Sequence, residues 1–148
     1  MDPLTTNAHR ETIEQRWPGL WRALEESPRA TTVDETGPPH TPETTLVIDG
    51  IHLTSCVDRR AEAELQAATV PLNATTVHVY GLALGDLQRA LLERKNLTRL
   101  VVVILSPTVS KESLSRFDHR DWLVDERVEL RLGRELDRVE GPLVVAPA

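Results

Sequence analysis

The sequence predicts an α/β protein: a Rossmann-like, three-layer domain with a mostly parallel sheet, preceded by an N-terminal helix and a β-hairpin. From residue 75 onward, apolar segments of strand length alternate with segments of helical periodicity, a pattern typical of parallel sheets with right-handed crossovers. Residues 101–104 are continuously apolar, as expected for a strand covered on both faces. Residues 75–94 read as a strand, a glycine turn and an amphipathic helix, which is the order that opens a Rossmann-like sheet.

The N-terminal segment, residues 1–27, is expected to be helical. An apolar stripe with largely helical spacing runs through residues 8–27 and consists of Ile13, Trp17, Leu20, Trp21 and Leu24. Such a stripe predicts a helix that packs on the core, and a partner-binding helix is the alternative. Pro18 lacks an amide hydrogen and is expected to kink or restart the helix.

Residues 28–44 are rich in proline, threonine and glutamate and are expected to form an extended linker. The remainder, residues 45–148, is expected to hold the hairpin and the Rossmann-like domain. Asp49 and Gly50 form a two-residue turn sequence, which places Ile48 opposite Ile51 and Leu46 opposite Leu53. A helix is predicted next, over 58–68, with three residues on its inner side: Ala61, Leu65 and Ala68.

The order of the remaining elements follows from the alternation of patterns. Strands are predicted at 75–80, 99–105, 127–132 and 143–145, with helices at 84–94 and 110–117.

Composition and charge argue against several classes of partner. The formal net charge is −6, acidic and basic residues are interspersed, and the five aromatic residues are scattered, so nucleic-acid binding is not expected. The longest apolar run, residues 100–105, is far too short to span a bilayer. A single cysteine, Cys56, and a polar first segment without a secretory pattern indicate a reducing, cytoplasmic location.

The glycine turn is the one place where a small ligand is expected, because open α/β sheets bind ligands beyond the carboxyl ends of their strands. The candidate residues follow two neighbouring strands: Gly81, Leu82, Ala83, Gly85, Asp86 and Ser106. Ala83 stands where a full fingerprint has its middle glycine, and the charge of Asp86 would repel an anion at the helix N-terminus. Any ligand is therefore expected to be neutral or cationic.

No catalytic residue, metal or cofactor is predicted. An S-adenosylmethionine-dependent methyltransferase is the alternative, but that chemistry favours an acid at the end of the second strand for the ribose hydroxyls, where Leu105 and Ser106 stand. Asp118, His119 and Asp121 are the densest cluster of ligand-type residues. They lack an evident further ligand, so a solvated loop is expected there. A nucleophile-elbow sequence is also missing.

Several short motifs together resemble the N-terminal region of the motility associated factor proteins, bacterial glycosyltransferase-like proteins linked to flagellin glycosylation. They are Arg-Trp-Pro-Gly-Leu at 16–20, Ile-Asp-Gly-Ile-His-Leu at 48–53, Val-Tyr-Gly-Leu-Ala-Leu-Gly at 79–85, Ala-Leu-Leu-Glu at 90–93 and Asp-Glu-Arg-Val at 125–128. The chain departs from that family at Ala83, at Asp86 and Leu87, where the family has an aromatic-His pair, and at Ser106-Pro107, where it often has Glu-Pro.

The resemblance implies kinship in fold and in pathway, without the larger catalytic region that such proteins carry downstream. We therefore expect a non-catalytic binding or interaction module. Its partner is expected to be another protein or a downstream domain outside this chain, acting with a glycosyltransferase.

Overall fold

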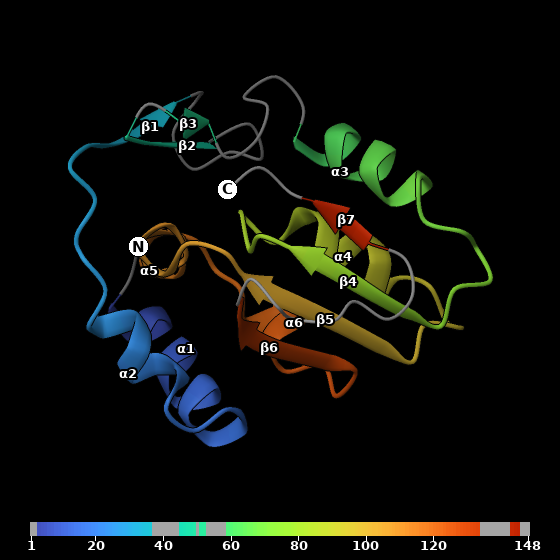
Figure 1. The fold of residues 1–148 in the computed structure, drawn as a ribbon, viewed down its shortest axis with the longest axis horizontal. Coiled ribbons are helices and arrows are strands. Elements are labelled where there is room, and N and C mark those ends of the chain that lie inside the picture. Colours follow the sequence, from blue (N-terminus) through green and yellow to red (C-terminus); the bar gives the residue numbers. More distant parts are fainter. Residues whose placement is uncertain (1–2, 37–44, 50, 53–58, 134–142, 146–148) are drawn as a thin grey trace.

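The computed structural model describes residues 3–36, 45–49, 51–52, 59–133 and 143–145. Its centre is a four-stranded parallel sheet with the order β6-β5-β4-β7 (Figure 1). The strands are β4 (Thr76–Tyr80), β5 (Arg99–Ile104), β6 (Val128–Leu132) and β7 (Leu143–Val145). Helix α4 (Asp86–Leu92) connects β4 to β5, and α5 (Pro107–Arg116) and α6 (Arg120–Leu123) lie between β5 and β6. This order is that of a Rossmann-like sheet. Strands β4, β5 and β6 follow one another toward one side of the sheet, and β7 then pairs with the other side of β4. The point at which the strand order reverses therefore lies between β4 and β7. The predicted fold class is confirmed.

The central strand β5 is buried on both faces of the sheet over residues 100–104, as the apolar run at 101–104 predicted. Val102 pairs in register with Val79 of β4 and Leu130 of β6, and these three side chains are at most 2% exposed. Val101 and Val103, which point to the opposite face of the pleat, are equally buried.

A second, antiparallel sheet contains β1 (Val33–Thr36), β2 (Thr45–Ile48) and β3 (Ile51–His52). The predicted hairpin register is confirmed where it is described, because Ile48 pairs with Ile51; Leu53 lies outside the described residues. The prediction of a linker over 28–44 is wrong in part. Val33 pairs with Ile48, so a third strand joins the hairpin. The sequence of this strand, Val-Asp-Glu-Thr, is mostly polar and therefore did not indicate the pairing with residues 45–48.

The N-terminal segment forms two helices, α1 (Pro3–Arg16) and α2 (Leu20–Glu25), separated at the predicted Pro18. Gly19 precedes α2 with a φ of 86°. Four members of the apolar stripe are buried in the main core: Ile13, Leu20, Trp21 and Leu24. Trp17 is only half-buried and lies beneath the Arg16 guanidinium, 4.5 Å from its ring centre. The packing interpretation holds for the stripe, although Trp17 lies at its margin.

Helix α3 (Arg59–Ala68) turns a different face inward from the one predicted. Leu65 is 73% exposed and Ala68 is also exposed, whereas Ala63 and Ala67 are buried. The reason is the contact between Arg59 and Asp86 of α4. Residues 59, 63 and 67 lie on one face of a helix, so this ion pair directs Ala63 and Ala67 toward α4. Cys56 lies outside the described residues.

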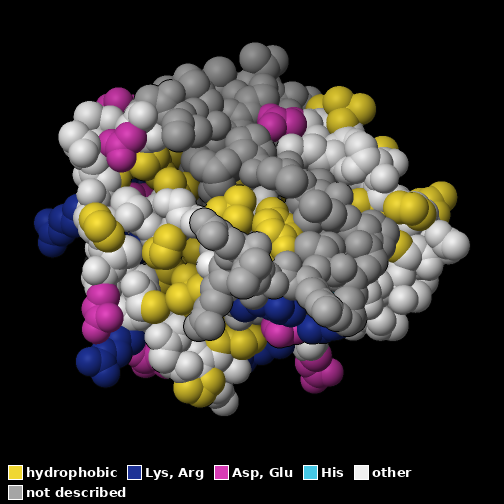
Figure 2. Space-filling model, viewed as in Figure 1, with side chains coloured by type: hydrophobic (Ala, Val, Ile, Leu, Met, Phe, Trp, Pro, Cys, Tyr) yellow, Lys and Arg dark blue, Asp and Glu magenta, His cyan; other side chains and the backbone are white. Residues whose placement is uncertain are grey.

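The described surface has a mixed charge. Figure 2 shows basic and acidic side chains interspersed around the margin of one face. Among the described helices, none combines the length and the apolar character needed to cross a bilayer.

Candidate functional site

The turn after β4 has an alternating backbone conformation. Gly81, Ala83 and Gly85 have φ values of 104°, 47° and 88°, which lie in the region that favours glycine. The amide of Gly81 donates to the Val103 carbonyl at 2.8 Å, which extends the β4–β5 pairing into the turn. Ala83 keeps the positive φ despite its Cβ, at a cost of about 1–2 kcal/mol. The turn thus has a positive φ at the position where a full fingerprint has its middle glycine.

The carbonyl groups of this turn are bonded by side chains of the same domain. Gln88 Nε2 donates to the Leu82 carbonyl at 2.8 Å and Arg89 Nη1 donates to the Leu84 carbonyl at 3.2 Å. Ser113 Oγ of α5 donates to the Ala83 carbonyl at 2.6 Å. Residues 81–85 are all buried. Three consecutive carbonyl groups of the turn, those of residues 82–84, are thus engaged by side chains of the domain.

The small antiparallel sheet lies against the same turn. Leu84 is 1% exposed and packs in a hydrophobic cluster with Leu46 and Ile48 of β2 and Val109 of α5. In Figure 1 this sheet is seen beyond the ends of β4 and β5 from which the chain enters α4 and α5. That is the edge at which open α/β sheets form their ligand crevice, and here β2 packs over part of it.

Asp86 is the first residue of α4 and joins α4 to α3. Its carboxylate lies 3.2 Å from Arg59 Nε and 3.4 Å from Arg89 Nη1, and the N-cap position is held by Gly85 without a side-chain bond. Burial raises the pKa of Asp86, while the two arginines act in the opposite direction. Arg59 and Arg89 therefore largely compensate the negative charge of Asp86. Asp86 should repel an anion at this helix N-terminus less than its position in the sequence suggested.

Ser106, the candidate on the neighbouring strand, begins α5. Its hydroxyl accepts from the Val109 amide at 3.3 Å, and Pro107 follows at the first helical position, which is a common N-terminal arrangement. The structure thus gives Ser106 a capping contact with its own helix. Of the six candidate residues, four lie in the turn, Asp86 begins α4 and Ser106 caps α5.

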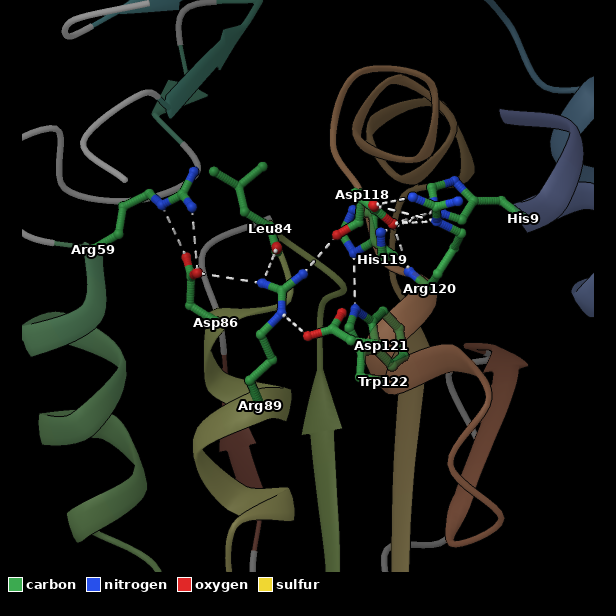
Figure 3. A network of polar contacts seen from close by, with 10 residues as sticks. All are labelled: His9, Arg59, Leu84, Asp86, Arg89, Asp118, His119, Arg120, Asp121 and Trp122. Atoms are coloured by element: carbon green, nitrogen blue, oxygen red, sulfur yellow. Dashed lines mark hydrogen bonds and ion pairs between the residues drawn. The ribbon is translucent and has the colours of Figure 1, made fainter. Parts of the chain in front are cut away.

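A buried chain of hydrogen bonds leads from α6 back to the turn, and Figure 3 shows its first contact, between Trp122 and His119. Trp122 Nε1 contacts His119 Nδ1 at 2.9 Å and His119 Nε2 contacts Ser113 Oγ at 2.9 Å. The indole N–H can only donate, so Nδ1 of His119 accepts and its proton lies on Nε2. Nε2–H then donates to Ser113, which donates to Ala83. The sequence-based expectation of a solvated loop is wrong for His119, which is 0% exposed.

This direction of donation excludes a nucleophilic role for the Ser113–His119 pair as it stands. A histidine that activates serine must accept the hydroxyl proton, whereas His119 donates to Ser113 and both are fully buried. Burial also lowers the pKa of His119 well below its usual range. The pair therefore holds the turn against α5 and α6.

The carboxylates of the predicted cluster have separate partners. Asp118 is paired with Arg120 at 2.7 Å and Asp121 with Arg89 at 2.7 Å. The hydrogen bonds from Arg120 hold the pKa of Asp118 well below its usual value. Within the described residues, no group of three or more His, Cys, Asp or Glu side chains is arranged to hold a metal ion.

A groove of about 380 Å³ runs between α3 and α4. Its charged lining residues have both signs: Arg59, Arg60, Glu64, Asp86, Arg89 and Glu93. Two ion pairs, Arg60–Glu64 and Arg59–Asp86, lie within this lining, so the groove has no strong preference for either charge.

The fold and this turn define a Rossmann-like α/β domain, and comparison with solved structures agrees. The chain superposes on spermidine synthase from Thermotoga maritima with a TM-score of 0.61 and 18% identity, over 80% of this chain and 46% of that one. A spermidine synthase in complex with the transition-state analogue AdoDATO gives the same score and identity, with 44% of its chain covered.

The MAf glycosyltransferase from Magnetospirillum magneticum AMB-1 is a further structural neighbour. It matches 91% of this chain and 28% of its own, with a TM-score of 0.64 and 15% identity. At these identities the similarity concerns the fold, and this chain spans less than half of each neighbour. No family model and no curated protein matches the sequence.

The sequence predicted the turn but not the residues whose side chains bond its carbonyl groups. Gln88, Arg89 and Ser113 carry no local motif, and His9 of α1, which contacts the His119 amide, is 110 residues away in sequence. One signal was present: Arg89 and Gln88 follow the glycine turn within the first helical turn of α4, close enough to bond the carbonyls before it.

Proposed function

We propose that this protein is a non-catalytic binding or interaction module, similar in fold to the N-terminal part of motility associated factor proteins. It would act with a glycosyltransferase in flagellin or surface glycosylation. The observation that carries the proposal is the closed state of the Gly81–Gly85 turn, whose carbonyls are bonded by Gln88, Arg89 and Ser113. A cofactor at this edge would have to displace contacts of the domain with itself.

The similarity to the MAf glycosyltransferase supports the choice of partner. It extends over 91% of this chain, which corresponds to a minor part, 28%, of the larger protein. The motifs at 16–20, 48–53 and 79–85 point in the same direction. A domain of this kind, without a described catalytic constellation, is best suited to position or accompany a catalytic domain.

The competing function is a small S-adenosylmethionine-dependent enzyme. Its support is the similarity in fold to spermidine synthases, one of which is in complex with AdoDATO. Against it stand the side-chain bonds that close the turn and Ser106 at the end of β5, where an acid would be needed for the ribose hydroxyls.

The test is a binding titration between the purified protein and a MAf-type glycosyltransferase of the same organism. We expect a complex with a Kd in the micromolar range, about −8 kcal/mol, and no methyl transfer by either protein alone. No complex at 100-fold higher concentration, together with turnover of S-adenosylmethionine, would overturn the proposal in favour of the enzyme.

A further inference from the structure

Helix α1 is attached to the rest of the domain through a pair of buried histidines. His9 of α1 and His119, just before α6, are both 0% exposed, and their rings lie 5.7 Å apart in an edge-to-face arrangement. His9 Nε2 lies 2.9 Å from the His119 amide nitrogen, and His9 Nδ1 lies 2.9 Å from the Leu114 carbonyl. A single side chain of α1 therefore bonds the end of α5 and the start of α6.

The partners fix the proton on each ring. The His119 amide can only donate, so His9 Nε2 accepts and Nδ1–H donates to Leu114. In His119 the arrangement is reversed, because the indole N–H of Trp122 donates to Nδ1 and leaves the proton on Nε2. Each ring thus presents its bare nitrogen to a donor. A second proton on either histidine would place two donors against each other.

The surrounding charges do not provide an acceptor in hydrogen-bonding range for that second proton. Asp118 Oδ1 is 3.7 Å from His9 Nε2, and both oxygens of Asp118 are already bonded by Arg120. Asp118 favours a charged His9, whereas Arg120 from the same segment opposes it. Around His119, Arg89 from α4 and His9 from α1 oppose a positive charge, whereas the hydrogen bond with Ser113 and the charge of Asp118 favour it.

We propose that this junction is a proton-sensitive attachment: protonation of His9 and His119 breaks the bond between His9 and the His119 amide and detaches the His9 portion of α1 from α5 and α6. Other contacts of α1 lie on both sides of His9. Thr5 is buried toward the N-terminus of the helix. Toward the C-terminus, Ile13 is fully buried and the Arg16 guanidinium donates to the Asp125 and Val128 carbonyls at 2.9 Å each. The Arg16 contacts do not involve either histidine, so we expect the C-terminal end of α1 to stay attached when the His9 contacts break.

The direction of the pH dependence follows from linkage. Burial lowers the pKa of both histidines in the attached state below the ordinary 6.5. The attached state is fully stable above about pH 6.5 and loses stability as the pH falls below that value. Each proton taken up on opening raises the opening constant about tenfold per pH unit, so two histidines give up to about a hundredfold.

The experiment is amide hydrogen exchange of the full chain by NMR between pH 7.5 and 4.5, with imidazole ¹⁵N shifts recorded in parallel. At pH 7.5 we expect His9 with its proton on Nδ1 and His119 with its proton on Nε2. Below pH 6 the opening constant of the His119 amide should rise between about 10-fold and 100-fold per pH unit, while β4 and β5 amides stay protected. A protected His119 amide in a molecule whose His9 is charged would overturn the proposal.

Variants separate this attachment from general acid unfolding. His9→Gln removes one titrating ring, so the rise per pH unit should fall to no more than tenfold; a profile equal to that of the unaltered protein would refute the role of His9. Thr12→Ala, a half-buried position on the same helix, should keep the original profile. If His9→Gln does not fold, the unaltered protein alone tests the proposal, through the imidazole ¹⁵N shifts of the two histidines and the exchange rate of the His119 amide.

Discussion

The two edges of the parallel sheet are closed in different ways. At the carboxyl edge, the Gly81–Gly85 turn is held by Gln88, Ser113 and the His119–Trp122 pair. At the amino edge, three arginines bond the backbone carbonyls at the ends of helices. The carboxyl edge depends mainly on buried polar contacts around a tight turn, with Arg89 also donating to the Leu84 carbonyl. The amino edge depends on arginine side chains that bond the ends of helices.

The arginines of the amino edge follow one rule. The last carbonyls of a helix lack partners within it, and basic side chains can supply them. Arg94 bonds the Ala67 and Val70 carbonyls at the end of α3, and Arg127 bonds the Leu92 and Arg94 carbonyls at the end of α4. Arg16 does the same after α6.

The carboxyl edge is the one that bears on cofactor binding. A Rossmann-like domain that binds a cofactor must leave its first turn accessible to that cofactor. In this protein the turn is buried, its carbonyls are bonded and β2 packs against Leu84. The comparison teaches that the polar groups of this edge serve the stability of the domain.

The largest effect is expected at the carboxyl edge from Gly85→Ala. A Cβ there would lie 2.6 Å from Trp122 Nε1 and 3.0 Å from His119 Nδ1, at a φ of 88°. Backbone strain and overpacking together should lower the free energy of unfolding by about 3–5 kcal/mol, measured by urea denaturation. Gly19→Ala is the matched control, because its φ is 86° and nothing lies within 4 Å of the new Cβ; about 1–2 kcal/mol is expected. Equal losses for both variants would show that the turn is not tightly packed.

At the amino edge, Arg127→Met should cost less. It leaves the Leu92 and Arg94 carbonyls without their donor, at about 1.5–3 kcal/mol for bonds that involve a charged group. Arg60→Met is the control, since Arg60 is exposed and pairs only with Glu64 in the contacts described for it; its effect should stay within about 0.5 kcal/mol. Thermal unfolding of both variants checks this. A neutral Arg127→Met would contradict the role given to the amino edge.

The smallest effect is expected from Asp86→Asn. Asparagine keeps an oxygen near Arg59 and Arg89 and removes a buried charge, so at pH 7 the fold should stay intact, with a change of about 1 kcal/mol or less. The folded-state pKa of Asp86 is raised above 3.8, so its stabilising contribution is greatest at low pH and is lost as the pH rises through the folded pKa.

The unaltered protein should therefore gain stability relative to Asp86→Asn on going from pH 7 to pH 4. A gain in the opposite direction would show that ion pairing outweighs burial at this carboxyl. The variant should also accept phosphate or sulfate at the turn more readily, which a titration with inorganic phosphate can measure.

The sequence predicted the parts of the fold that depend on local pattern. Strands 76–80, 99–104 and 128–132 and the break at Pro18 follow from period, β-branching and proline chemistry. Strand β1 and the inward face of α3 could not be predicted, because they depend on the pairing of Val33 with Ile48 and of Arg59 with Asp86. At the site, glycines 81 and 85 indicated the turn. The contacts that close it could not be predicted, because Ser113 bonds the Ala83 carbonyl from 30 positions away.

The most direct test of the closed carboxyl edge is a calorimetric titration of the full chain with S-adenosylmethionine. The account predicts no saturable heat, which corresponds to a Kd weaker than about 1 mM or a binding free energy smaller than about 4 kcal/mol. Saturable binding at micromolar concentration, about 8 kcal/mol, that is lost in Gly85→Ala at a temperature where the variant is folded, would show that the turn is a cofactor site and would contradict it.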